Sequence, residues 1–177
     1  AFSADNKFST VVGRATNGAS PVDLTLQNLT AAIASIELRN GKNSANEEFK
    51  DVVIDWKAGV EPEEATITLT NYNVGNGLVI QSLEVGTNTP DDDLEELNLV
   101  ANAGTGADKD IEVQSLVLDT VETINVTGSA NLDIGSISNG VTDTVDASAF
   151  TGDLVVQLGY ANGTKGGTIL GGSGDDS

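Results

Sequence analysis

The chain has 177 residues and an acidic composition, with 27 Asp and Glu against 8 Lys and Arg, for a formal net charge of −19. This balance excludes nucleic-acid binding, because neutralising phosphates requires a basic patch. The chain contains no Cys and no His, and only 4% of its residues are aromatic. Disulfides, thiolate metal sites and catalytic schemes that depend on His or Cys are therefore excluded.

The acidic residues are concentrated beyond residue 60. Residues 1–60 carry six basic and seven acidic residues, whereas residues 61–177 carry two basic and 20 acidic residues. Self-repulsion of this size destabilises a compact state unless something offsets it. We therefore expect two parts: a less regular β or capping region of near-neutral charge (1–60), and an acidic region (61–177) that binds divalent cations. The alternative is that the acidity only keeps a secreted protein soluble.

Short runs of β-branched residues and Leu, bounded by Gly, Asn and Asp, predict strands along the chain. In residues 26–38 one or two helical turns are an alternative, but the alternation in AIASIEL favours a strand. We expect less than about 15% helix, well below the usual share in globular proteins. The later runs are DVVIDW (51–56), ATITLT (65–70), LVIQSLEV (78–85), LEELNLV (94–100), DIEVQS (110–115), VETINV (121–126), NLDIGS (131–136) and DLVVQL (153–158).

Several of these runs recur as pairs. A first type of strand is IASIEL, LEELNL, VETINV and VTDTVDAS (141–148), and a second type follows each of them as DVVIDW, DIEVQS, NLDIGS and DLVVQL. The later pairs repeat about every 20 residues, a spacing typical of stacked repeats that share a thin core. The sequence therefore predicts an all-β fold, a parallel β-solenoid (β-helix or β-roll) with irregular repeats. A β-sandwich, which also has many short strands, is the alternative.

Alternation within the later runs also predicts which side chains face the core. We expect these residues to point inward: Val121, Ile124, Val126, Leu132, Ile134, Val145, Leu154 and Val156. We expect their neighbours Glu122, Asn125, Asp133 and Asp153 to be exposed.

The last seven residues contain the most specific motif. They fit the first seven places of the calcium-binding nonapeptide G-G-x-G-x-D-x-U-x. Glycines allow the tight turns that direct carbonyl oxygens inward, and the aspartates add the charged oxygens that calcium prefers. One nonapeptide supplies only part of a calcium shell. The candidate ligands here are Gly171, Gly172, Gly174, Asp175 and Asp176.

Two other turns concentrate carboxylates. Asp91, Asp92 and Asp93 precede Glu95 and Glu96, and this run does not fit the EF-hand pattern. A second, weaker candidate is the pair Asp108 and Asp110 in a Gly-rich turn. Both groups are candidate calcium ligands, and an exposed, solvated loop is the alternative for each.

The order VETINV, NLDIGSIS, TVDASAFTGDLVV, TILGGSGDD gives the chain a family resemblance over residues 94–177. It resembles the RTX-type calcium-binding bacterial surface proteins, in the branch of S-layer proteins and adhesins that includes the Caulobacter-type S-layer proteins. The resemblance implies a calcium-dependent β-solenoid, export by type I secretion and lateral assembly on the cell exterior. Residues 1–60 match this pattern less well.

We therefore expect a non-enzymatic structural module of a secreted, calcium-stabilised S-layer or surface array. Its expected partners are copies of itself and cell-surface polysaccharide, with no nucleic acid and no membrane insertion. One alternative is a stalk or ligand-binding segment of a large RTX adhesin, and another is the calcium roll of a type I secreted enzyme. No catalytic residues are expected, since paired carboxylates occur without the aromatic residues that stack on sugars.

Overall fold

The structure, a computed structural model, describes residues 10–14, 21–30, 35–41, 48–57, 59, 62–86, 94–137, 141–159 and 167–177. Within these ranges the secondary structure consists of strands alone, so the predicted all-β class and low helix content are confirmed for that part of the chain. The same ranges include no helix with the length and apolarity that a membrane crossing requires.

The strands form two sheets. Sheet A contains, in spatial order, β1 (Thr10–Arg14), β3 (Ser35–Arg39), β5 (Glu64–Asn71), β7 (Glu96–Ala103), β10 (Thr123–Gly128), β12 (Thr144–Asp146) and β14 (Thr168–Leu170). Sheet B contains β2 (Val22–Leu29), β4 (Glu48–Trp56), β6 (Leu78–Val85), β8 (Asp110–Val113), β11 (Asn131–Ile137) and β13 (Leu154–Leu158), with β9 (Leu116–Leu118) beside β6 and β11.

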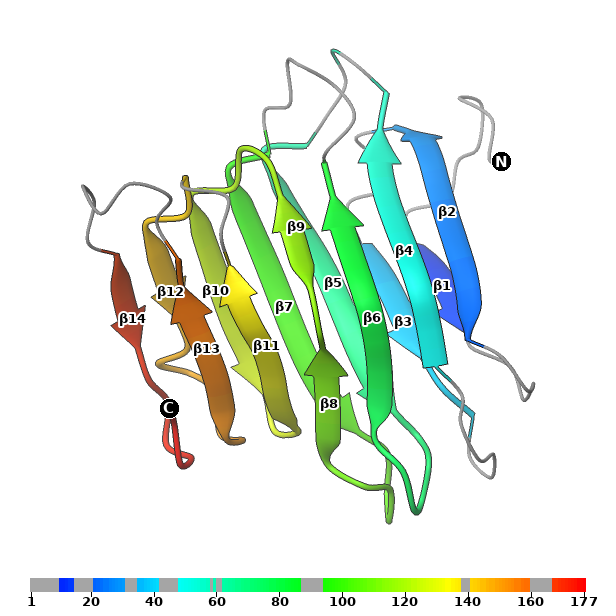
Figure 1. Ribbon diagram of the computed structural model, residues 1–177, viewed down its shortest axis with the longest axis vertical. Helices are drawn as coiled ribbons and strands as arrows, with labels where there is room; N and C mark the ends of the chain where they lie inside the picture. Colours follow the sequence, from blue (N-terminus) through cyan, green and yellow to red (C-terminus); the bar gives the residue numbers. More distant parts are fainter. Residues whose placement is uncertain are drawn as a thin grey trace.

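All pairs among the described strands are parallel, and the chain crosses between the sheets after almost every strand. Sheet A holds the odd-numbered strands up to β7, and sheet B holds the intervening ones. β8 and β9 follow one another along the same neighbour, β6, and act as one interrupted strand. Figure 1 shows the two layers face to face, with the arrows of one sheet pointing opposite to those of the other.

The two predicted types of strand lie in different sheets, and β5 and β6, which the predicted repeat left out, form a further pair between them. The first type of strand lies in sheet A as β3, β7, β10 and β12, and the second type lies in sheet B as β4, β8, β11 and β13. In the later part, Thr123 pairs with Thr144 and Asp110 pairs with Asn131, in each case 21 residues apart. Earlier, Ser35 pairs with Thr66, 31 residues on. The repeats are therefore longer in the earlier part of the chain.

One core lies between the sheets. All eight residues predicted to face inward are buried in it, and Glu122, Asp133 and Asp153 are exposed, while Asn125 is half-buried. The inward and outward faces of these strands are thus as predicted. The core also buries three of the few aromatic residues, Trp56, Phe49 and Phe150, so it is not built from aliphatic side chains alone.

The charge boundary at residue 60 falls between β4 and β5. Both sheets pair across it, because β3 pairs with β5 in sheet A and β4 pairs with β6 in sheet B. The near-neutral and acidic parts of the chain therefore contribute to the same two sheets.

Candidate functional site

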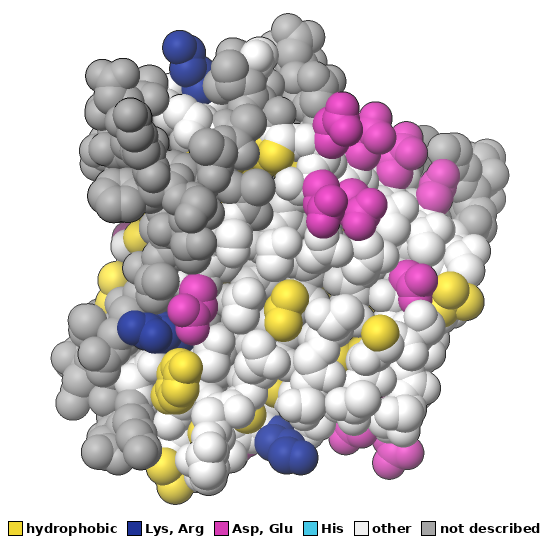
Figure 2. Space-filling model, turned by 180° about the vertical axis from the view of Figure 1, so that it is seen from behind, with side chains coloured by type: hydrophobic (Ala, Val, Ile, Leu, Met, Phe, Trp, Pro, Cys, Tyr) yellow, Lys and Arg dark blue, Asp and Glu magenta, His cyan; other side chains and the backbone are white. Residues whose placement is uncertain are grey.

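Acidic side chains gather where the sheet A strands begin. The predicted cluster at residues 91–96 contributes Glu95 and Glu96, whereas Asp91, Asp92 and Asp93 lie outside the described residues. Parallel pairing places further glutamates beside these two, since Glu64 pairs with Glu96. Together they line a shallow hollow formed by Glu63, Glu64, Glu95, Glu96, Glu122 and Thr123. Figure 2 shows acidic side chains grouped on this face of the molecule.

Backbone hydrogen bonds hold this acidic row in register. The Glu95 amide donates to the Glu63 carbonyl at 3.0 Å, and the Glu122 amide donates to the Glu95 carbonyl at 2.9 Å. Two asparagines partly satisfy the adjoining carboxylates: Asn98 donates to Glu64, and Asn125 donates to Glu96, each at 2.6 Å. Neighbouring strands lie about 4.8 Å apart, so the glutamates on adjacent strands bring like charges close together. Sequence reasoning missed Glu63, Glu64 and Glu122, because only the strand register reveals the row.

The C-terminal motif lies at one end of the two sheets. The Asp176 carboxylate accepts hydrogen bonds from the Gly172 amide at 2.8 Å and the Leu154 amide at 3.1 Å. The Ser177 amide donates to the Leu154 carbonyl at 2.9 Å, so this segment continues sheet B beside β13. Asp176 therefore occupies the place next to Leu154, in a row that is apolar in the preceding strands.

The glycines of this motif are required by close backbone approach. A Cβ at Gly172 would overlap the Phe150 carbonyl oxygen, and a Cβ at Gly174 would overlap the Gly152 carbonyl oxygen. No side chain larger than hydrogen fits at either position without a backbone shift. The motif thus brings the backbone of this turn directly against carbonyl oxygens of the preceding one.

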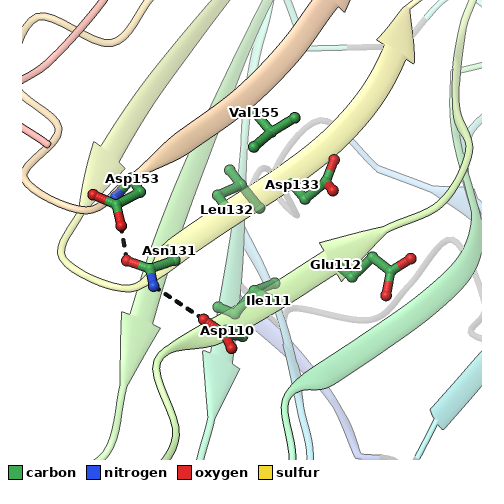
Figure 3. A pocket seen from close by; sticks show the side chains of 8 residues that line it. All are labelled: Asp110, Ile111, Glu112, Asn131, Leu132, Asp133, Asp153 and Val155. Atoms are coloured by element: carbon green, nitrogen blue, oxygen red, sulfur yellow. Dashed lines mark hydrogen bonds between the residues drawn. The ribbon is translucent and has the colours of Figure 1, made fainter. Parts of the chain in front are cut away.

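A second row of Asx residues marks the start of the sheet B strands. The Asn131 amide group donates to the Asp110 carboxylate at 3.0 Å, and the Asp153 backbone amide donates to the Asn131 side-chain oxygen at 3.2 Å. The Asp175 backbone amide continues the row by donating to the Asp153 carboxylate at 2.8 Å. Figure 3 shows the first three of these side chains aligned across β8, β11 and β13. The row joins two predicted candidates, Asp110 and Asp175, that are far apart in sequence.

A hollow of about 270 Å³ lies beside this row on the outside of sheet B. Glu112 and Asp133, which pair in register, lie on one side of it, and Val155 contributes an apolar patch (Figure 3). The other predicted ligand of this turn, Asp108, accepts a hydrogen bond from the Asp110 backbone amide at 3.0 Å. Asp108 thus shapes the turn that leads into β8.

The described residues include no group of three or more acidic side chains placed to hold a metal ion together. Each carboxylate oxygen of Asp176 accepts one hydrogen bond from a backbone amide and keeps a lone pair beyond it. These two oxygens are far fewer than the six to eight that surround calcium. Asp176 can bind a hard cation such as calcium only if other groups supply the remaining oxygen ligands.

A buried polar cluster lies at the opposite ends of the sheet A strands. The fully buried Asn71 accepts from the Asn40 side chain at 2.7 Å and donates to the carbonyls of Asn76 and Asp108 at 3.0 and 3.1 Å. Asn40 in turn accepts from the Tyr72 amide at 2.7 Å. These bonds satisfy the backbone where the chain leaves sheet A for sheet B, so the cluster orients the turn that carries Asp108. Nothing in the local sequence pattern signalled it.

Two charged side chains have pKa values shifted from the ordinary value for their type. The hydrogen bond from the Ser148 side chain, followed by that from its backbone amide, holds the pKa of Asp146 below its ordinary value. The hydrogen bond to Asp51 raises the pKa of Lys50. Both are local turn or strand interactions outside the acidic rows.

The chain was compared with protein-family models, curated proteins and solved structures, and none of these matches it.

Proposed function

We propose that the chain folds as an irregular parallel β-solenoid, in which each coil contributes one strand to sheet A and one to sheet B. The alternation of strands between the sheets and the 21-residue registers in the later part support this. A β-sandwich also packs two sheets on one core, but its sheets are typically antiparallel with hairpin or Greek-key connections. Here every pair of strands is parallel.

The function that we propose is a structural module of a secreted bacterial S-layer or comparable surface array, stabilised by calcium. The observation that carries the proposal is the stacking of carboxylates in register across neighbouring strands. Residues 61–177 hold 20 acidic residues and only two basic ones. A chain that aligns so many negative charges is stabilised by any cation that binds only the folded state.

Calcium ligands in this proposal come from three turns. The first is residues 171–176, where Asp176 and the glycine backbone supply part of a shell. The second is Asp108 and Asp110, and the third is Asp91, Asp92 and Asp93. We expect the third group to matter most, since its three carboxylates are consecutive and the C-terminal motif is a single nonapeptide.

Thermal melts test the calcium part of the proposal. A ligand that binds only the folded chain adds about 2.7 kcal/mol at a hundredfold excess over its Kd. We expect millimolar calcium to raise the melting temperature and a chelator to lower it, with magnesium a poor substitute because it prefers a smaller octahedral shell. Sodium chloride of equal ionic strength is the control. If sodium chloride raises the melting temperature as much as calcium does, the effect is general screening of the repulsion between carboxylates, and the proposed assignment of calcium ligands is wrong.

Variants then separate the candidate sites. Replacing Asp91, Asp92 and Asp93 by Asn should remove most of the calcium effect, and replacing Asp175 and Asp176 by Asn should remove less. Electron microscopy of the chain with and without calcium tests the array itself, for which ordered sheets are the expected result. Dispersed particles under both conditions would argue against an array-forming module.

A further inference from the structure

The turn that leads from β5 in sheet A to β6 in sheet B carries an Asn-Gly pair, Asn76-Gly77, that is open to solvent. Asn76 is exposed and Gly77 is half-buried, and Val74 and Gly75 in the same turn are exposed as well. An Asn-Gly pair is typical of a tight turn. It is also the pair in which asparagine reacts most readily with its own backbone, because glycine has no side chain to shield the amide nitrogen that follows the asparagine.

Packing in sheet B requires the glycine of this pair. A Cβ at Gly77 would lie 2.7 Å from the Asp110 carbonyl oxygen, so no larger side chain fits there unless the backbone shifts. The close approach occurs where β6 and β8 begin to pair, with Leu78 beside Ile111. The unshielded amide next to Asn76 is therefore imposed by the fold.

A second Asn-Gly pair, Asn40-Gly41, has the opposite environment, because both of its residues are buried. The Asn40 side-chain nitrogen donates to the Asn71 side-chain oxygen, and the Asn40 side-chain oxygen accepts from the Tyr72 amide, each at 2.7 Å. Its side-chain amide therefore cannot turn toward the Gly41 nitrogen without breaking the buried cluster. The hydrogen bond that Asn76 makes within the described residues is on its backbone carbonyl, which accepts from Asn71 at 3.0 Å, so its side chain is left to rotate.

We propose that Asn76 is a site of spontaneous deamidation and that the fold protects Asn40 from the same reaction. The Gly77 backbone nitrogen gives up its proton and attacks the Asn76 side-chain carbonyl carbon, which forms a new C–N bond. The bond from that carbon to the side-chain nitrogen breaks, and the nitrogen leaves as ammonia with the proton. Water then opens the resulting succinimide ring at either carbonyl, which gives an aspartate or a β-linked isoaspartate. Water is the one reactant consumed.

The product changes the turn next to the buried polar cluster. It adds a negative charge, and the β-linked form also lengthens the backbone by one methylene group. The Asn71 side-chain nitrogen binds the backbone carbonyls of Asn76 and Asp108, at 3.0 and 3.1 Å. The β-linked form displaces the first of these carbonyls, so Asn71 loses one of the bonds through which it holds the two turns together. This modification is independent of the proposed function and of calcium.

Peptide mass spectrometry of the full chain after incubation in a mildly alkaline buffer tests the proposal. Conversion at Asn76 should be at least about tenfold faster than at Asn40, since Asn40 reacts only after the buried cluster opens. The same incubation in urea is the control, because unfolding exposes both pairs and their rates should then become similar. Asn76→Gln should abolish conversion at this position, since glutamine would have to close a larger ring.

Three results would overturn the proposal. The first is an Asn76 that reacts in urea but stays unmodified in the folded chain, because the turn would then protect it. The second is equal rates at Asn76 and Asn40 in the folded chain, and the third is no conversion at either residue even in urea. Three further Asn-Gly pairs begin at Asn17, Asn139 and Asn162, outside the described residues, and the spectra resolve each of them separately.

Discussion

Ile124 lies in the middle of an inward-facing row of sheet A, and Leu154 lies on β13, the last named strand of sheet B; both side chains are buried. Truncating either to Ala removes packed methyl groups and leaves a cavity, which typically costs 2–5 kcal/mol. We expect a loss of about that size in the free energy of unfolding, measured by chemical denaturation. Val117→Ala, at an exposed valine, is the control and should cost under about 0.5 kcal/mol. Small effects at both buried sites would contradict the register described above.

A comparison of Gly152 with Gly75 tests whether close backbone contacts require a glycine. A Cβ at Gly152 would overlap the Ala130 carbonyl oxygen, whereas one at Gly75 meets no atom within 4 Å. We expect Gly152→Ala to destabilise the chain by about 1–3 kcal/mol through a forced backbone shift. Gly75→Ala should be neutral or slightly stabilising, because alanine restricts the unfolded chain. Equal melting temperatures for the two variants would show that the turn at Gly152 is looser than its contacts imply.

Asp146 makes a pH-dependent contribution whose sign is set by its lowered pKa. The carboxylate accepts hydrogen bonds from the Ser148 side chain and, at 2.9 Å, from the Ser148 backbone amide, so the folded state favours the charged form. This contribution is present above the unfolded pKa and is lost as pH falls through the lower, folded pKa. The stability difference between the native chain and Asp146→Ala should therefore hold at neutral pH and shrink below about pH 4. Urea midpoints across this range measure it, and a difference that grows in acid would contradict the assignment.

At the scale of elements, the glutamate row at the start of sheet A sets carboxylates on successive strands. Two unit charges about 5 Å apart repel by about 1 kcal/mol at the dielectric of water, before screening. Glu95→Gln removes the middle charge of the row and should raise the melting temperature by about 1–3 °C at low salt. The gain should fade as salt is added. Glu84→Gln is the control, since Glu84 pairs with Val53 and Val117 rather than with another acidic residue. An equal rise in melting temperature for Glu84→Gln would mean that the net charge of the chain, and not the glutamate row, determines the effect.

The elements also show how far the sequence predicted the fold. Alternating Val, Ile and Leu predicted the strands, their inward faces and the two types of repeat, because side-chain direction has a period of two along any strand. The pairing of Glu64 with Glu96, and of Asn131 with Asp110, could not be predicted. Irregular turn lengths decide which residues of successive repeats lie side by side, and the acidic and Asx rows follow only from that register. The Asn40–Asn71 cluster was missed for the same reason.

For the whole molecule, we propose that calcium binding offsets the charge that the two parallel sheets bring together. Isothermal titration calorimetry of the full chain in a buffer with about 0.15 M sodium chloride tests it most directly, since physiological salt screens exposed charges beyond roughly 8 Å. Saturable calcium binding is expected, weakened when Asp91, Asp92 and Asp93 are replaced by Asn, and far weaker for magnesium. Heats no larger than those of dilution, or equal binding of the two cations, would contradict it.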